Sequence, residues 1–277
     1  MEEPGYLTIE ETASRLGLHY MTVYRYVRIG RLPAEYRQGR WQISSEVVTQ
    51  VAAGAHPKPE PTSGAGRDPV GRLLDRLVAG DGPGSWSIVE AALTAGSPSR
   101  IYTELLAPAL RTLGEEWAAG RYSVADEHRA TTVALGIVGR LGPLFRRRGR
   151  RRPGQVLLAG VEGDSHAIPL TMVADSLTAG GFEVIHLGAD VPTTELVAVA
   201  AANPGLRSVG LSAGTDASAE RAAAAIAGLR ERVGGLRVVV GGPAVTGEQA
   251  ARALGADGWA ADAVAAVEVI ASMGGHR

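Results

Sequence analysis

Residues 154–275 alternate short apolar runs with longer segments of helical periodicity. Continuous apolar strands separated by helices are typical of a parallel sheet covered on both faces. We therefore predict a Rossmann-like α/β domain over residues 149–277, with the flavodoxin-like strand order. Its expected strands are 155–161, 183–187, 208–211, 237–240 and 258–260, and its expected helices are 168–178, 194–201, 217–233, 247–254 and 261–273.

The loop after the first expected strand carries an Asp and a His two residues apart, Asp164 and His166. In a parallel sheet this loop lies at the carboxyl ends of the strands, where ligands bind. An Asp that holds the proton of one imidazole nitrogen leaves the other nitrogen to coordinate a metal. The spacing is a weak signal alone, because an isolated loop His is usually only solvated. His186, between apolar neighbours on the second expected strand, is predicted to be packed rather than a ligand.

Composition narrows the class of protein. With 277 residues, a net charge of −1 and 45% hydrophobic residues, the chain can form about two domains with real cores. Cysteine is absent, so any metal must be held by His, by carboxylates or within a preassembled cofactor. The sequence has neither a secretory signal pattern nor a run of about eighteen apolar residues. We expect a cytoplasmic protein with no membrane partner.

Residues 1–55 have the pattern of a winged helix-turn-helix. Thr8 and Glu11 have capping-box spacing, and Gly17 ends the first helix. A second helix over 19–30 follows after a tight turn. A hairpin over 36–43, with a glycine at its turn, precedes a further helix. This pattern resembles the DNA-binding head of the MerR and excisionase families.

Positive charge gathers on the second helix and the hairpin of this block. Between His19 and Trp41 there are five Arg and one acid, Glu35. Arg side chains neutralise phosphates and reach guanine edges in the major groove. We predict a duplex DNA operator as partner, and the alternative is an interaction-only helix-turn-helix with a solvated charged face. The candidate DNA contacts are Tyr20, Thr22, Tyr24, Arg25, Arg28, Arg37 and Arg40.

A linker and a helical region separate the head from the α/β domain. Residues 56–67 are rich in Pro and Gly and cannot bury a core. Residues 68–148 show helical periodicity interrupted at 82–84, 96–98 and 119–120, which predicts a four-helix bundle.

The third connection of this bundle and the Asp-His loop together resemble one family. Trp117, Glu127 and His128 form a W-x9-E-H motif, which resembles the helical cap of the cobalamin-binding, light-responsive repressors of the CarH and LitR class. Asp164 and His166 form the D-x-H signature of cobalamin-binding domains. The resemblance implies that His166 is the lower axial ligand of cobalt and Asp164 its partner. It also implies that Trp117 packs against the upper face of the cofactor, with Glu127 and His128 near its adenosyl group.

Two further loops fit the nucleotide tail of a cobalamin. Ser212 corresponds to the Ser of the family's S-x-L segment, and Gly241-Gly242 corresponds to its GG, where missing side chains allow close approach. The sequence departs from the family at Gly214, where Leu is usual, and at Pro169, where Gly is usual. Proline is acceptable in a first helical turn, so we expect the helix after His166 to form.

A further departure concerns light. In the light-responsive members a His follows the motif's Trp and becomes the second axial ligand after illumination. Here that position is Ala118, which cannot ligate a metal. After illumination we expect either a water-ligated cobalt or ligation by His128.

The resemblance covers almost the whole chain. It implies a non-enzymatic, cobalamin-dependent repressor, with adenosylcobalamin as the expected form, whose DNA binding is controlled by light and by self-association into a dimer or tetramer. The alternatives are a light-independent cobalamin-sensing regulator and a corrinoid methyl carrier. A body that binds another chromophore, or nothing, and serves only for oligomerisation is the third.

Overall fold

The computed structural model describes residues 5–18, 20, 23, 26–27, 32, 34–37, 40–52, 68–145 and 154–273. These residues fall into two compact units, one drawn from residues 1–92 and 104–133 and the other from residues 93–103 and 134–277. Within the part of the chain that the structure describes, none of the helices is both long enough and apolar enough to cross a membrane.

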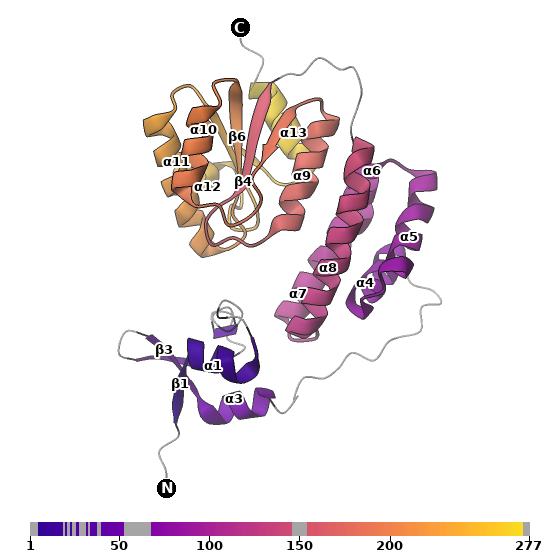
Figure 1. Cartoon of the computed structure of the whole chain (residues 1–277), viewed down its shortest axis with the longest axis vertical. Helices are drawn as coiled ribbons and strands as arrows, with labels where there is room; N and C mark the ends of the chain where they lie inside the picture. Colours follow the sequence, from indigo (N-terminus) through magenta and orange to yellow (C-terminus); the bar gives the residue numbers. More distant parts are fainter. Residues whose placement is uncertain are drawn as a thin grey trace. The chain divides into compact units, whose positions relative to one another are not determined.

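The first unit begins with the head, by which we mean the described residues between 5 and 52. Its elements are β1 (Tyr6–Thr8), α1 (Ile9–Leu16), β2 (Ala34–Arg37), β3 (Arg40–Ser44) and α3 (Ser45–Ala52). The strands pair antiparallel in the order β1-β3-β2 (Figure 1). The predicted capping box is confirmed, since the Glu11 carboxylate accepts from the Thr8 amide at 2.8 Å and the Thr8 hydroxyl accepts from the Glu11 amide at 3.2 Å. The hairpin was predicted, whereas β1 was not.

The helical region follows the expected pattern with one corrected boundary. Its elements are α4 (Pro69–Ala79), α5 (Gly82–Ala95), α6 (Pro98–Arg100), the π-helix η1 (Ile101–Leu106), α7 (Ala107–Ala118), α8 (Val124–Leu141) and η2 (Gly142–Phe145). The predicted break at residues 82–84 is wrong, because these residues form the first turn of α5. Proline is tolerated there since its missing N–H has no helical partner to lose. The chain turns instead at Gly80, whose φ is 75°.

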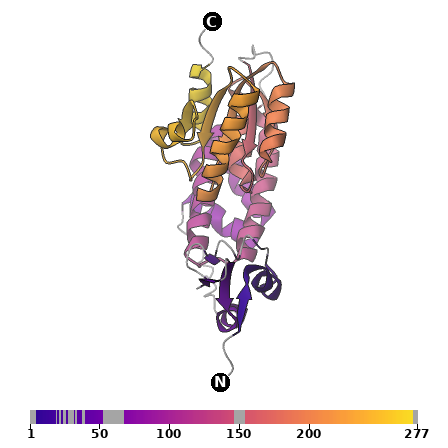
Figure 2. The same ribbon diagram turned by 90° about the vertical axis from the view of Figure 1, so that its left-hand side faces the viewer.

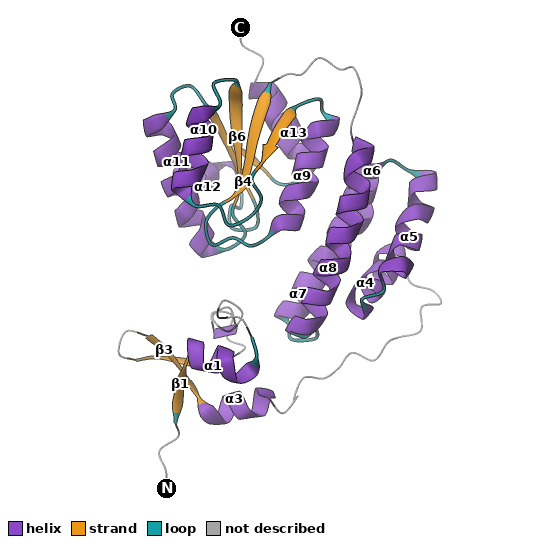
Figure 3. Ribbon diagram, in the orientation of Figure 1, coloured by secondary structure: helices purple, strands orange, loops and turns teal. Residues whose placement is uncertain are grey.

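The second unit contains the sheet domain, residues 154–273. Its elements are β4 (Gln155–Gly160), α9 (Ala167–Ala179), β5 (Glu183–His186), α10 (Thr193–Ala202), β6 (Leu206–Ser212), α11 (Asp216–Arg232), β7 (Arg237–Gly241), α12 (Glu248–Ala253), β8 (Gly258–Ala260) and α13 (Ala263–Met273). All pairings are parallel, in the order β5-β4-β6-β7-β8, which confirms the flavodoxin-like prediction (Figure 3).

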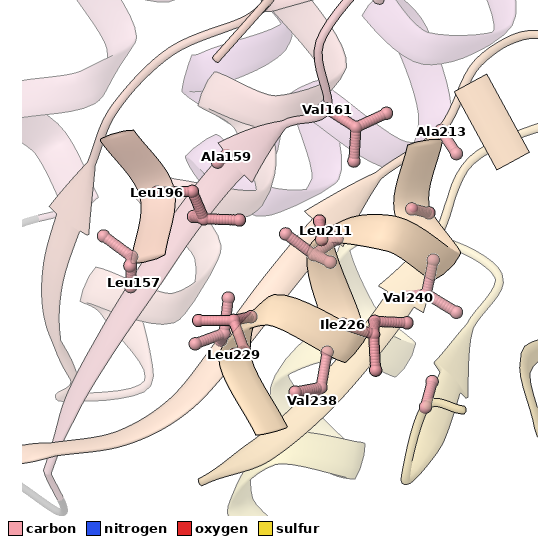
Figure 4. Close-up of a cluster of buried hydrophobic side chains, with 14 of the residues drawn as sticks. Leu157, Ala159, Val161, Leu196, Leu211, Ala213, Ile226, Leu229, Val238 and Val240 are labelled. Atoms are coloured by element: carbon pink, nitrogen blue, oxygen red, sulfur yellow. The ribbon is translucent and has the colours of Figure 1, made fainter. Parts of the chain in front are cut away.

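The sheet is buried on both faces, as its continuous apolar strands predict. On β4, Leu157 and Ala159 face one core while Val156 and Leu158 face the other. The first core packs against α10, α11 and α12, and Figure 4 shows it around Leu196, Ile226 and Leu229. The second core packs against α9 and α13, and the layers are also seen in the turned view of Figure 2. The loops that follow β4, β5, β6 and β7 therefore meet at one edge.

Candidate functional site

The loop after β4 holds Asp164 and His166 in direct contact. Oδ1 of Asp164 lies 2.6 Å from Nδ1 of His166 and also accepts the His166 amide at 3.1 Å. A carboxylate can only accept, so Nδ1 carries the proton, and in the neutral imidazole this leaves a lone pair on Nε2. The Asp164 side chain is 1% exposed and that of His166 is 44% exposed. The pair can therefore present one nitrogen to a metal from a fixed support.

The environment of Asp164 favours its charged form. Burial alone raises the pKa of this carboxyl, but hydrogen bonds from the His166 side chain, from the His166 amide and from the Gly214 amide outweigh burial. The net result is a lowered pKa. Asp164 thus remains an ionised acceptor for Nδ1 at neutral pH.

The loops on both sides of β4 also contact this pair. The Gly214 amide, after β6, donates to Oδ2 of Asp164 at 2.5 Å. The Asp190 amide, after β5, donates to the backbone carbonyl of Asp164 at 2.8 Å. Oδ1 of Asp190 accepts from the Gly163 amide at 2.6 Å. Asp164 is therefore fixed by three loops.

Ser212, Gly241 and Gly242 lie at the neighbouring strand ends, as predicted. Ser212 pairs with Gly160 on one side and with Gly241 on the other. A Cβ added to Gly241 would lie 2.6 Å from the Ala260 carbonyl oxygen, and one added to Gly242 would clash with the Ala213 carbonyl. The space that these glycines leave open is therefore filled by neighbouring backbone.

Trp117 ends α7 and packs against the head. Its side chain is 5% exposed, and its ring centroid lies 5.5 Å from that of Tyr26 at an interplanar angle of 33°. That separation is typical of a favourable aromatic pair. Tyr122 and Val124, which follow in the chain, pack against the same cluster, whose buried members are Ile9, Ala13, Val23, Tyr26, Val27, Leu32, Ile43, Val48 and Trp117.

Glu127 and His128 lie in the first turns of α8. Oε2 of Glu127 is 2.7 Å from Nδ1 of His128, and Oε1 accepts from the Thr131 hydroxyl at 2.7 Å. The His128 side chain is 66% exposed, so its ring is accessible. Trp117, Glu127 and His128 belong to the first unit, whereas the predicted site residues of the sheet domain belong to the second.

The candidate DNA contacts are only partly described. Tyr20 is 39% exposed. The backbones of Arg37 and Arg40 are opposite each other at the end of the β2–β3 hairpin. Thr22, Tyr24, Arg25 and Arg28 lie outside the described residues.

One prediction for the sheet domain is wrong and two contacts were missed. His186, the last residue of β5, is exposed rather than packed, although partial burial of its ring lowers its pKa. Sequence reasoning did not select Asp190 and treated Gly214 only as a departure from the family. The signal for Asp190 was its residue type in a loop, since Asp tolerates left-handed backbone better than most residues.

Three parts of the chain match known families. Residues 154–268 match a B12 binding domain family, residues 70–141 match a second B12 binding domain family, and residues 6–54 match a helix-turn-helix domain family. These ranges agree with the sheet domain, the helical region and the head. The described fold resembles a solved monomethylamine corrinoid protein from Methanosarcina barkeri, with a TM-score of 0.67, 23% identity, and coverage of 75% of this chain and 99% of that chain.

Two curated relatives match larger parts of the sequence. The HTH-type transcriptional repressor CarH of Myxococcus xanthus is 34% identical over 186 residues, covering 64% of this chain and 58% of the repressor. A corrinoid protein of Desulfitobacterium hafniense is 31% identical over 172 residues, covering 59% of this chain and 77% of that protein. The chain spans less than two thirds of the repressor, and it spans 11% of the methionine synthase of Mycobacterium tuberculosis that it also matches.

Proposed function

The chain belongs to the corrinoid proteins that carry a B12 binding domain, and on that premise we propose that it is a cobalamin-dependent transcription regulator. The observation that carries the cofactor part is the 2.6 Å contact of Asp164 with Nδ1 of His166, which leaves Nε2 to coordinate cobalt. The helix-turn-helix match over residues 6–54 and the likeness to a repressor support the regulatory part.

The donor chemistry of the site fits a corrinoid. A neutral imidazole whose second nitrogen is held by a carboxylate is a suitable axial ligand for a transition metal. When bound, cobalamin supplies a cobalt ion whose upper substituent can be exchanged. Ser212 is the proposed polar contact of the nucleotide tail. Gly241 and Gly242 contribute by letting the loops around that tail close on one another.

Trp117 offers a route from the cofactor to the head. Its ring packs on Tyr26 in the head, and it is also the residue proposed to cover the upper face of the corrinoid. One buried ring cannot make both contacts with the same face. We propose that cofactor binding draws Trp117 away from Tyr26, so that the cofactor changes the head's DNA affinity.

The adenosyl form, light control and control by a dimer or tetramer belong to the same proposal. Ala118 cannot provide a second protein ligand, so any ligation by protein after illumination falls to another side chain. The proposed substitute is His128, which is 66% exposed. Spectra and size-exclusion profiles, dark against illuminated, test this in wild type and His128→Ala. A bis-histidine spectrum that persists in His128→Ala would reject His128 as the substitute.

The central test combines cofactor binding with DNA binding. Purified chain is loaded with adenosylcobalamin, freed of excess cofactor and examined by visible absorbance. Duplex affinity is then measured with and without the cofactor. We expect retained visible bands and a cofactor-dependent change in affinity. Retention with unchanged DNA affinity would contradict the regulatory part, and no retention would contradict the whole proposal.

The head has its own test. Replacing Arg37 and Arg40 by Ala should weaken binding across duplex sequences and flatten the salt dependence by about one unit per lost phosphate contact. Replacing Arg140 and Arg232, which lie on helices of the second unit, is the matched control. Equal effects of the two double replacements would reject the hairpin as a DNA contact.

A corrinoid methyl carrier is the second candidate. The favouring observation is that the fold likeness covers 99% of a monomethylamine corrinoid protein. A carrier does not require DNA contact, so the helix-turn-helix match over residues 6–54 argues for the regulator. Turnover of a methylated cofactor in the presence of a methyl acceptor, without any effect on DNA affinity, would favour the carrier.

A further inference from the structure

We propose that Asp190 is a positioning residue for the metal ligand: together with Gly214, it clamps the Asp164–His166 pair from the loops on either side of β4. This inference rests on the proposed role of His166 as an axial ligand. It adds two residues that support the ligand without touching the metal.

Asp190 makes two contacts with the loop after β4. Its amide donates to the backbone carbonyl of Asp164 at 2.8 Å, and its carboxylate accepts from the Gly163 amide at 2.6 Å. Each contact fixes one side of the turn that leads to the ligand. The Asp164 backbone can then shift only if Asp190 moves with it.

The backbone of Asp190 is strained, which indicates a conformation imposed by its contacts. Its φ is 55°, and among the described residues it is the one non-glycine with a positive φ. Asp and Asn adopt this region more readily than other side chains, but the conformation remains unfavourable for both. The two contacts with residues 163 and 164 offset that cost.

Gly214 closes the other side of the clamp. Its amide donates to Oδ2 of Asp164 at 2.5 Å, which leaves Oδ1 for His166. A Cβ at this position would lie 2.8 Å from Nδ1 of His166 and 3.1 Å from each carboxylate oxygen of Asp164. Any side chain at position 214 therefore has to push the pair apart in this geometry. The family's Leu at this position would therefore require a different placement of the pair from the one seen here.

The strand order makes the clamp symmetrical about the ligand loop. Because β4 lies between β5 and β6, the loops that carry Asp190 and Gly214 flank the loop that carries Asp164 and His166. Gly242 supports the Gly214 side of the clamp, since its missing side chain lets the loop after β7 approach the Ala213 carbonyl. A ligand imidazole held in this way loses little conformational freedom when it binds metal.

The test compares three substitutions at Asp190. Asp190→Ala removes the carboxylate and disfavours the backbone conformation, and we expect affinity for hydroxocobalamin to fall by about 10-fold or more. Asp190→Gly permits the backbone but removes the acceptor, and a similar loss would assign the effect to the carboxylate. Asp190→Asn keeps an acceptor oxygen and should restore affinity to within about 3-fold of wild type.

A matched control lies in the same domain. The Asp262 carboxylate accepts from the amides of Val264 and Ala265 at 2.9 Å, so Asp262→Ala removes a similar backbone contact away from the ligand loop. Gly214→Ala is paired with Gly234→Ala, since a Cβ at 234 would meet nothing within 4 Å. Both controls should bind cofactor as wild type does.

A second readout needs no cofactor. Hydrogen exchange of the amides of Gly163, His166 and Gly214 in cofactor-free protein should be faster in Asp190→Ala and unchanged in Asp262→Ala. Unchanged exchange together with wild-type cofactor affinity in Asp190→Ala would overturn the clamp. Failure of the wild type to bind any cobalamin would instead contradict the proposed function, while exchange would still decide whether the clamp exists.

Discussion

The ligand loop of the sheet domain and the cap segment (residues 117–128) differ in what holds their functional side chains. Backbone amides from two neighbouring loops fix Asp164, which fixes His166. Trp117 is held by side-chain packing on Tyr26 in the head, and His128 is mostly exposed. Backbone contacts define one geometry, whereas packing between rings can be exchanged for another partner. The loop that carries His166 is therefore suited to keep one geometry. The cap segment is suited to exchange one packing partner for another.

The largest effect is expected from removing the packing that holds the cap segment. Trp117→Ala removes a buried indole from the head cluster and should lower the free energy of unfolding by about 3–5 kcal/mol, because it leaves a cavity. Thermal and denaturant unfolding of cofactor-free protein measure the loss. Trp86→Ala, at a half-buried position on α5, is the control. Equal losses would show that Trp117 contributes no more to stability than a half-buried Trp outside the hydrophobic cluster of the head.

The next largest effect is expected from removing the proposed metal ligand itself. His166→Ala removes the proposed coordinating nitrogen and should weaken cofactor binding by at least about 100-fold, equivalent to about 2.8 kcal/mol. Titration followed by visible absorbance measures it. An unchanged spectrum and affinity would remove His166 as the ligand.

Asp164→Asn leaves His166 in place and tests only the carboxylate that holds its Nδ1. An amide cannot hold Nδ1–H as strongly as a carboxylate, so cofactor affinity should fall by about 10–100-fold. The same variant has a pH signature. Because the pKa of Asp164 is lowered from 3.8, its contribution to stability is present above that value and lost as the pH falls further.

Acid unfolding of cofactor-free protein checks this sign. Asp164→Asn should flatten the loss of stability below about pH 4. The pKa of Asp257 is also lowered, since hydrogen bonds from Arg230 and the Val238 amide outweigh its burial, so Asp257→Asn is the control for other carboxylates of the sheet domain. An acid profile identical to wild type in Asp164→Asn would contradict the assigned direction.

The smallest effect is expected at His128. Its side chain is 66% exposed and its contact with Glu127 lies on the helix surface, so His128→Ala should change the free energy of unfolding by less than about 0.5 kcal/mol. Chemical denaturation of cofactor-free protein is the measurement. A larger loss would mean that the Glu127–His128 contact supports the fold rather than remaining available to a ligand.

The sequence predicted the sheet domain well because local patterns determine it. Every expected strand from residues 155 to 260 was found, since runs such as Val156–Leu158 have no other stable place than a covered sheet. The Asp164–His166 contact was also predictable, because two residues of separation limit where the imidazole can lie. The wrong break at residues 82–84 arose from reading Gly and Pro as interruptions, when they begin α5.

The supports of the site were not predictable from local patterns. Asp190 contacts a residue that lies 27 positions earlier in the chain, and Gly214 contacts one 50 positions earlier. Such contacts depend on which strands are neighbours and on their register. The packing of Trp117 on Tyr26 is a still longer contact, and neither residue alone indicates it.

The position of β4 in the sheet has a consequence for the order of assembly during synthesis. β4 is the first strand of its domain in sequence, and its two neighbours are the next two strands to be made. Every hydrogen bond described for the ligand pair comes from residues up to 214. The pairings of β4 with β5 and β6 involve no residue beyond 212, so they can form before the rest of the domain has been made. We therefore expect the ligand geometry to form while β7 and β8 are still leaving the ribosome, so that a nascent chain already displays the imidazole before its last helices dock.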